Sequence, residues 1–351
     1  MMTERQNIRI RFFADTHLGF DYPIRPRISR RRRGYDFFDN FHRVLDGAAA
    51  ARVDLLIHGG DLFFRSRVPP RIVDMSYEAL IEFAHKGIPV VIVPGNHERS
   101  RLPTSLFLAH PNIFVFAAPM TYEFKVRGAR ICVSGFPFQK GNIRSHFPSV
   151  LNETGWDKTN GDIRLLCIHQ AVEGAQVGPA NFTFRNGQDV IRFDDFPDKF
   201  HAVLAGHIHR RQILQGKPNE AEGPVRVIYS GSTERTSFAE KDEPKGFFDL
   251  TFASTEEGGW RLDGLDFSQL PARPMIDLEL QQDVSNKSLE SWLLTQIAKI
   301  DENAIVRIRS AGPVNEAIRT KMTSGFLREI FPQSMNVQLG SEFRPYVRKD
   351  R

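Results

Sequence analysis

The segment LLIHGGDLFF, residues 55–64, decides how the rest of this chain is interpreted. Its apolar half predicts a buried β-strand, and that strand stops at two glycines followed by Asp61. A glycine at a strand end lets another group approach the backbone closely. A carboxylate in this place therefore predicts a binding site for a polar or charged group.

Further apolar runs of the same kind predict the rest of the core. They cover residues 8–15, 88–96, 129–136, 163–169, 201–207, 225–231, 246–253 and 260–267. Helical patterns at residues 36–51 and 71–87 separate the first three strands. Strands that alternate with helices predict an α/β fold in layers. The later strands have fewer helices between them, so we expect a second sheet packed against the first, with helices flanking both.

The pattern changes near residue 270 and predicts a second, smaller domain. We expect a first domain at residues 1–270 and an α+β domain at residues 271–351. The second domain contains a helix at residues 288–300, a strand at 304–312 and a helix at 314–331.

Composition limits the class of protein. The chain has 351 residues, of which 41% are hydrophobic and 25% charged, an ordinary globular balance. No apolar run reaches the roughly 18 residues that a membrane span needs. The first strand begins by residue 8, too soon for a signal peptide. Cys132 and Cys167 lie in apolar runs, as buried reduced thiols do. We therefore expect a cytoplasmic protein with no membrane partner.

Side chains that can bind metals follow these strands where each becomes a loop. They are Asp15, His17, Asp61, Asn96, His169, His207 and His209. In layered α/β folds, ligands bind outside the carboxyl ends of the strands. Mixed oxygen and nitrogen ligands suit manganese, iron or zinc better than calcium or magnesium. Seven such groups exceed the needs of one tetrahedral ion, so we expect two ions that share Asp61 as a bridge.

Five short motifs carry a resemblance to a known family. DTHLG (15–19), GGDLF (59–63), GNHE (95–98), His169 and GHIH (206–209) resemble the blocks of the calcineurin-like metallophosphoesterases. YSGSTERTSFAE (229–240) and KGFFDL (245–250) resemble, more narrowly, the SbcD-type DNA repair exonucleases. The resemblance implies a metallophosphoesterase fold in which residues 271–351 form a capping, DNA-recognition domain.

The resemblance also implies roles for the site residues. One ion is expected on Asp15, His17, Asp61 and His209, and the other on Asp61, Asn96, His169 and His207. His97 is expected near the phosphate, where it protonates the leaving oxygen as a catalytic residue. The family usually uses Mn²⁺. Two departures from its pattern stand out: Phe64 takes the place of a histidine that helps to hold the phosphate, and Glu98 takes the place of an aspartate.

The function that the resemblance implies is hydrolysis of DNA phosphodiesters in repair or end processing. It implies a 3′–5′ exonuclease on double-stranded DNA that also cuts single strands internally. SbcD-type enzymes are commonly homodimers and work with an SbcC-type ATPase, which they contact beyond the cap. The sequence ends at YVRKDR, soon after the elements of the second domain, and leaves little length for such a contact segment. We therefore expect either an SbcC-type partner or a different ATPase or translocase.

A basic tract gives a second clue to the substrate. The net charge is +5, and RPRISRRRRG (25–34) contains six arginines and no acidic residue. Such a tract suits a polyanion, although an isolated charge run is more often a solvated loop. We expect the tract to contact DNA phosphates without reading bases. Its members are Arg25, Arg27, Arg30, Arg31, Arg32 and Arg33.

Two other functions remain open. A phosphodiesterase or phosphatase for a small nucleotide or another small phosphoester could use the same metal centre. A non-enzymatic subunit could keep the fold for binding alone, although a complete ligand set argues against it. The chain has neither a GxSxG motif nor a P-loop, so nothing indicates a serine nucleophile or a nucleotide cradle of that kind.

Overall fold

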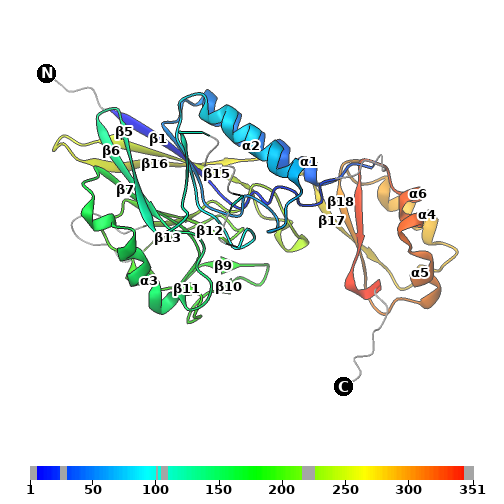
Figure 1. Cartoon of the computed structure of the whole chain (residues 1–351). Helices are drawn as coiled ribbons and strands as arrows, with labels where there is room; N and C mark the ends of the chain where they lie inside the picture. The colour runs from blue at the N-terminus through cyan, green and yellow to red at the C-terminus, as the bar shows by residue number, and fades with distance from the viewer. Residues whose placement is uncertain (1–5, 24–29, 100–101, 104–109, 216–225, 344–351) are drawn as a thin grey trace. The chain divides into compact units, whose positions relative to one another are not determined.

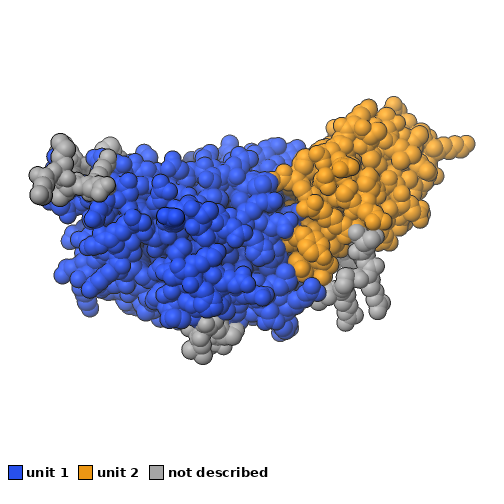
Figure 2. Space-filling view, turned by 90° about the horizontal axis from the view of Figure 1, so that it is seen from above, with its two compact units in different colours: residues 1–20, 36–271 blue, residues 21–35, 272–351 orange. Residues whose placement is uncertain are grey.

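The computed structural model describes residues 6–23, 30–99, 102–103, 110–215 and 226–343. The chain divides into two compact units, which Figure 2 shows in different colours. Unit 1 comprises Met1–Phe20 and Asp36–Pro271, and unit 2 comprises Asp21–Tyr35 and Ala272–Arg351. The division after Pro271 lies next to the expected domain boundary, but residues 21–35 group with the C-terminal unit and not with their sequence neighbours.

The first sheet of unit 1 has the order β16-β15-β1-β2-β3-β4 (Figure 1). Its parallel strands are β1 (Asn7–Phe13), β2 (Leu55–His58), β3 (Val90–Ile92) and β4 (Ile113–Val115). Two antiparallel strands extend it, β15 (Gly246–Ser254) and β16 (Trp260–Gln269). Helices α1 (Gly34–Ala50) and α2 (Pro70–Ala84) connect β1 to β2 and β2 to β3. The carboxyl ends of β1, β2 and β3 therefore lie at one edge.

The second sheet has the order β13-β14-β12-β7-β6-β5. Its strands are β5 (Met120–Val126), β6 (Ala129–Gly135), β7 (Ile163–His169), β12 (Ala202–Gly206), β13 (Gln212–Gln215) and β14 (Arg226–Tyr229). The central strands β6, β7, β12 and β14 are parallel, so their carboxyl ends also share an edge. Helix α3 (Ile143–Glu153) follows β6.

The core of unit 1 lies between the two sheets. Ile10, Ile57 and Val91 of the first sheet join one buried apolar cluster with Leu165 and Leu204 of the second. Burial on both faces explains why these strands read as continuous apolar runs. Helices α1 and α2 lie on one side of unit 1 and α3 on the other (Figure 1). The predicted layered α/β fold, with two sheets and flanking helices, is confirmed.

Short elements fill the loops of unit 1. Small strand pairs join β8 (Ala171–Val172) to β11 (Val190–Ile191) and β9 (Gln176–Val177) to β10 (Phe182–Thr183). Single 3-10 turns lie at Trp156–Lys158, Phe193–Asp195 and Phe238–Glu240. Within the described ranges no helix has the length and apolar character needed to cross a membrane.

Unit 2 is a three-stranded parallel sheet with helices. Its strands are β17 (Met275–Leu280), β18 (Ile305–Ser310) and β19 (Asn336–Leu339), in that order. Its helices are α4 (Leu289–Ile297), α5 (Glu316–Lys321) and α6 (Ser324–Ile330), and a 3-10 turn lies at Ser341–Phe343. Leu278 and Val306 pack with Leu293 and Leu327 in a separate apolar core.

Two details of unit 2 differ from the sequence expectation. The helix predicted at residues 314–331 is two helices, because the Thr323 hydroxyl accepts the backbone N–H of Phe326 and so begins α6 anew. Strand β19 was not predicted. It is only four residues long and half-buried, so it lacks a clear apolar pattern.

Candidate metal centre

The predicted site residues lie at the carboxyl ends of both sheets in unit 1. Asp15 and His17 follow β1, Asp61 follows β2, and His207 follows β12. All four adopt left-handed backbone conformations, with φ of 53°, 46°, 54° and 85° respectively. This region is uncommon for residues other than glycine and tends to occur at functional sites. The unusual backbone turns these side chains toward one another instead of along their strands.

One group of donor atoms gathers around Asn96. Its Oδ1 atom lies 3.0 Å from Nε2 of His169 and 2.8 Å from Nδ1 of His207. Oδ2 of Asp61 lies 3.4 Å from the same Nε2 atom of His169. The structure thus brings together the four residues that were expected to hold one ion.

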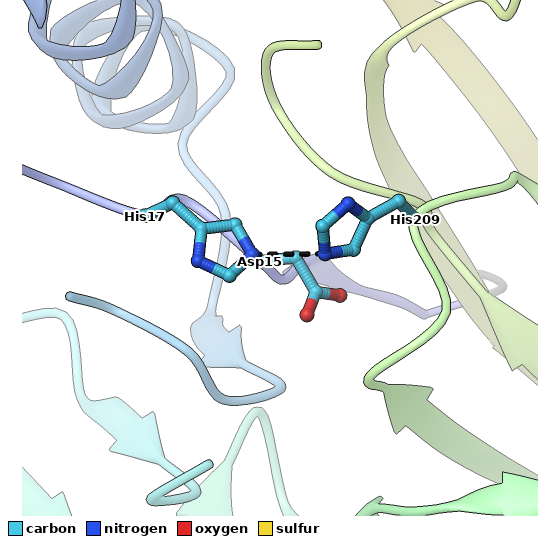
Figure 3. Close-up of side chains that lie close together, drawn as sticks. All are labelled: Asp15, His17 and His209. Carbon is cyan, nitrogen blue, oxygen red and sulfur yellow. Dashed lines mark hydrogen bonds between the residues drawn. The ribbon is translucent and has the colours of Figure 1, made fainter. Parts of the chain in front are cut away.

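A second group comprises Asp15, His17 and His209, which Figure 3 shows as sticks. The Nε2 atoms of His17 and His209 face each other at 2.9 Å. The Asp15 carboxylate accepts the backbone N–H of His207, at 3.1 and 3.2 Å from its two oxygens. Nε2 of His17 also lies 3.9 Å from Oδ2 of Asp61. Asp61 therefore lies between the two groups, where a bridging carboxylate is expected.

The donor set fits divalent cations on its own chemistry. Nε2 of His17 and Nε2 of His209 point at each other, beside the carboxylates of Asp15 and Asp61. Together these groups have more lone pairs than hydrogen atoms with which to pair them, as expected of a cation site. Nε2 of His17 faces both Nε2 of His209 and Oδ2 of Asp61. It is therefore the ring nitrogen of His17 that a cation at this place would meet. Imidazole and carboxylate ligands in this arrangement suit manganese, iron or zinc.

Burial and charge together perturb the pKa values at the centre. Burial raises the pKa of Asp15. Burial also opposes the charge on Asp61, but His169 and the other nearby imidazoles outweigh it and hold the Asp61 pKa below its usual value. The pKa of His169 rises to about 9, because the charge of Asp61 overcomes the effect of burial. Burial and His169 lower the pKa of His207 to about 3. Such divergent values are typical of functional sites.

His97 lies beside the two groups and differs from them in exposure. Its backbone N–H donates to Oδ1 of Asp61 at 2.9 Å, and its Nδ1 atom lies 2.6 Å from the carbonyl oxygen of Phe64. Its Nε2 atom lies 3.8 Å from Oδ2 of Asp61, and 35% of the side chain is exposed. The ring is thus held from behind and presents Nε2 both to the centre and to solvent.

Two glycines beside the ligands, Gly60 of the opening segment and Gly95 before Asn96, now have an explanation. A Cβ atom on Gly60 would collide with the ring of His169, and one on Gly95 would collide with the carboxylate of Asp61. The groups that approach the strand ends closely are therefore the other side chains of the same centre. Only glycine leaves room for them.

Glu98, which stands where the resembled family has an aspartate, supports the ligand loops from behind, as the sequence suggested. Its carboxylate is buried and accepts the backbone N–H groups of Phe63 at 2.6 Å and Gly95 at 2.7 Å. It therefore ties the loop after β2 to the loop after β3, which carry Asp61 and Asn96. Burial, assisted by the charge of Asp61, raises the pKa of Glu98 to about 8.

The arginine tract has a different environment from the one expected. Arg25 and Arg27 lie outside the described residues. The guanidinium of Arg30 donates to the carbonyl oxygens of Arg328, Phe331, Pro332 and Met335, at 2.8–3.2 Å. These four acceptors lie in the last turn of α6 and in the segment that follows it. The Arg30 guanidinium is therefore occupied within unit 2 and is not part of the proposed DNA-contacting set.

The rest of the tract is also partly engaged. The Arg31 backbone N–H donates to the carbonyl of Gln333, and Arg32 pairs with the carboxylate of Asp21. Arg33 is only 8% exposed. A charge run in a sequence does not reveal the partners of Arg30 and Arg31, because they come from a segment about 300 residues later.

Comparison with known proteins places these observations in a family. Residues 8–211 match the family model described as calcineurin-like phosphoesterase. A DNA double-strand break repair protein Mre11 of Methanococcus maripaludis is 26% identical over 249 residues, which cover 67% of this chain and 60% of that protein. The Mre11 protein of Archaeoglobus fulgidus is 24% identical over 320 residues, which cover 86% of this chain and 68% of that one.

A solved structure resembles the chain more distantly. A dimetal phosphatase from Danio rerio is 12% identical with a TM-score of 0.45, over 75% of this chain and 99% of that one. The chain spans 60% and 55% of the length of two curated Mre11 relatives, from Methanococcus maripaludis and Thermoplasma acidophilum.

Proposed function

The chain belongs to the calcineurin-like phosphoesterase family, and on that premise we propose that it is a two-metal nuclease that hydrolyses phosphodiester bonds in DNA. The observation that carries the proposal is the position of Asp61. Its carboxylate lies between two groups of donor side chains, beside His97. The names of the Mre11 relatives support DNA repair as the setting and DNA as the substrate.

We assign the two metal sets as the resemblance implied. Asp15, His17 and His209 would hold one ion, Asn96, His169 and His207 would hold the other, and Asp61 would serve both. A pair of ions held there would make hydroxide available near neutral pH and offset the charge that builds on the phosphoryl oxygens. Mn²⁺ is our specific choice, because the resembled family usually uses it; the mixture of imidazole and oxygen ligands is compatible with manganese, iron or zinc.

His97 is the proposed proton donor to the departing sugar oxygen. The Phe64 carbonyl accepts the hydrogen on Nδ1, so Nε2 is the atom that can carry a second proton toward the substrate. Histidine suits this task because its ordinary pKa lies near working pH. Because Phe64 replaces a histidine expected to hold the phosphate, that contact is absent from the proposed mechanism.

Several finer features are part of the proposal. We propose 3′–5′ exonuclease activity on double-stranded DNA, internal cleavage of single strands, and phosphate contacts by Arg31 and Arg32; the burial of Arg33 removes it from the set. We also propose that unit 2 acts as the capping, DNA-recognition domain. We further propose that the protein forms a homodimer and works in the cytoplasm. We also propose that it has an ATPase or translocase partner, of the SbcC type or another.

A phosphodiesterase for small phosphoesters is the alternative, and one experiment separates it from the nuclease. Purified protein with Mn²⁺ is incubated with end-labelled linear DNA, closed circular DNA and a small chromogenic phosphodiester. We expect turnover of linear DNA to exceed that of the small diester, and chelation by EDTA to abolish both.

The matched control for this experiment is His97→Asn, which keeps the proposed metal ligands. Its loss of cleavage excludes a contaminating nuclease. Efficient turnover of the small diester with intact DNA would favour the alternative. Wild-type protein that binds Mn²⁺ but hydrolyses neither substrate would contradict the proposed function altogether.

A further inference from the structure

The segment YSGSTERTSFAE and the lysine that follows it have no role in the mechanism above, yet they end beside the metal centre. Glu240 closes the 3-10 turn Phe238–Glu240 and is only 8% exposed. The Lys245 side chain is completely buried. Buried ionised groups are costly unless they are paired and hydrogen-bonded, so both require an explanation.

Glu240 is bonded to the back of a proposed metal ligand. Its Oε1 atom lies 3.2 Å from Nδ1 of His209 and accepts the hydroxyl of Thr236 at 2.6 Å. Its Oε2 atom lies 2.7 Å from Nζ of Lys245. The opposite ring nitrogen of His209, Nε2, is the atom that faces His17 in Figure 3.

Lys245 fixes both Glu240 and the backbone of the same histidine. Its ammonium group donates to the carbonyl oxygen of His209 at 2.9 Å and pairs with Glu243 at 3.2 Å. Glu243 in turn accepts Nε–H of Arg210 at 2.9 Å. The network therefore holds the backbone carbonyl of His209 and the side chain of the next residue, Arg210, as well as the ring itself.

Stability alone does not account for this network. A buried ion pair can often be replaced by apolar side chains of similar volume without loss of stability. A neutral imidazole, however, carries its proton on only one nitrogen, and a metal binds the other. A carboxylate at Nδ1 selects the Nδ1–H form and leaves the lone pair on Nε2. It also makes that lone pair a better donor.

We propose that Glu240, itself held by Lys245, is a positioning residue that keeps His209 in the Nδ1–H form with Nε2 directed at the ion shared with Asp15 and His17. This inference rests on the proposed two-metal centre. His17 has no such support at its Nδ1 atom among the described residues, so His209 is the better fixed of the two facing rings.

The test compares two variants with the wild type. Glu240→Gln keeps the shape and removes the charge. The double variant Glu240→Leu with Lys245→Met removes the whole pair and leaves no unpaired buried charge, which protects against misfolding. Glu243→Gln is the matched control, because it removes a charge from the same network without touching the His209 ring.

The first readout needs no metal and no activity. Nitrogen-15 NMR of histidine-labelled, metal-free protein reports which ring nitrogen of His209 carries the proton. We expect the Nδ1–H form in the wild type and in Glu243→Gln, and a shift toward the Nε2–H form in the double variant. An Nε2–H form in the wild type, or an unchanged form in the double variant, overturns the proposal.

The second readout is Mn²⁺ affinity, measured by calorimetry or by electron paramagnetic resonance. We expect the double variant to bind one of two ions about 10–100-fold more weakly, and Glu240→Gln to show a smaller loss. Equal affinities in the double variant and the wild type also overturn the proposal. Because the NMR readout uses metal-free protein, it stands even if the protein proves not to cleave DNA.

Discussion

Two regions look functional in the sequence but have different surroundings in the structure. One is the strand-end cluster of unit 1, which comprises Asp15, His17, Asp61, Asn96, His97, His169, His207 and His209. The other is the arginine tract of unit 2. The strand-end residues come from separate loops and meet, so that their closest polar partners are mainly one another. The guanidinium of Arg30 instead bonds to four carbonyls at the end of α6.

The difference lies in what each pattern can predict. A polar residue at the end of a buried parallel strand has its place set by topology, because parallel strands bring their carboxyl ends to one edge. An arginine in a run has a long side chain, and the unsatisfied carbonyls at a helix end offer it acceptors within the protein. Charge density alone therefore does not distinguish a binding surface from a structural contact.

The largest expected effect concerns His97, the exposed member of the strand-end cluster. His97→Asn should lower DNA cleavage by about 10²–10⁴-fold, the usual contribution of a positioned proton donor. Mn²⁺ stoichiometry should stay unchanged, because His97 is not a proposed ligand. Cleavage rates and calorimetry measure the two quantities. Cleavage at the wild-type rate would remove His97 from the chemistry.

The next effect tests whether Arg30 is structural. Arg30→Met should lower the free energy of unfolding by about 2 kcal/mol, since it leaves carbonyls that had accepted bonds from a charged donor. Arg30→Lys should recover only part of this loss, because an ammonium group cannot span the same acceptors as the planar guanidinium. Denaturant titration measures both variants. If Arg30→Met unfolds at the same denaturant concentration as the wild type, the bonds from Arg30 to these carbonyls do not contribute to stability.

A smaller effect is expected on the pH dependence of stability, and it concerns His58, a buried histidine that is not a proposed metal ligand. His58 is buried, accepts the N–H of Gly60 on Nδ1 and contacts Thr16, and burial lowers its pKa to about 3. Between pH 6.5 and 3 the unfolded chain binds a proton that the folded protein does not. Stability must therefore fall as the pH falls, by up to about 1.4 kcal/mol per pH unit.

His58→Asn keeps an acceptor for Gly60 but cannot be protonated in this range. Its unfolding free energy, measured in EDTA between pH 6.5 and 5, should fall less steeply than that of the wild type. Parallel curves for the two proteins would mean that His58 does not remain neutral in the folded state.

The smallest effect concerns the arginines that stay in the DNA-contacting set. Arg31→Gln should reduce the slope of log affinity against log salt concentration by about 0.9, the value for one phosphate contact. Binding to double-stranded DNA at several salt concentrations measures the slope. An unchanged slope would extend the structural role of Arg30 to its neighbour.

Much of the fold, and the meeting of the candidate donor side chains, followed from the sequence, because both depend on local patterns. Apolar runs located the strands of both sheets, and the residues just after them located the centre. Glu240 and Lys245 were not assigned a role, because their contacts with His209 depend on the path of an irregular loop. The carbonyl acceptors of Arg30 could not be predicted from the sequence either, since no local pattern relates residue 30 to a segment about 300 residues away.

The left-handed backbone at Asp15, His17, Asp61 and His207 has a consequence for metal selection. Main-chain hydrogen bonds hold it, from Asp15 N–H to Gly60 O at 2.9 Å and from His17 N–H to Asp61 O at 3.0 Å. The fold itself, through its main chain, thus sets the direction in which these donor groups point. A geometry fixed in this way would offer the same ligands to any transition metal, so cellular supply would weigh in which of them is loaded.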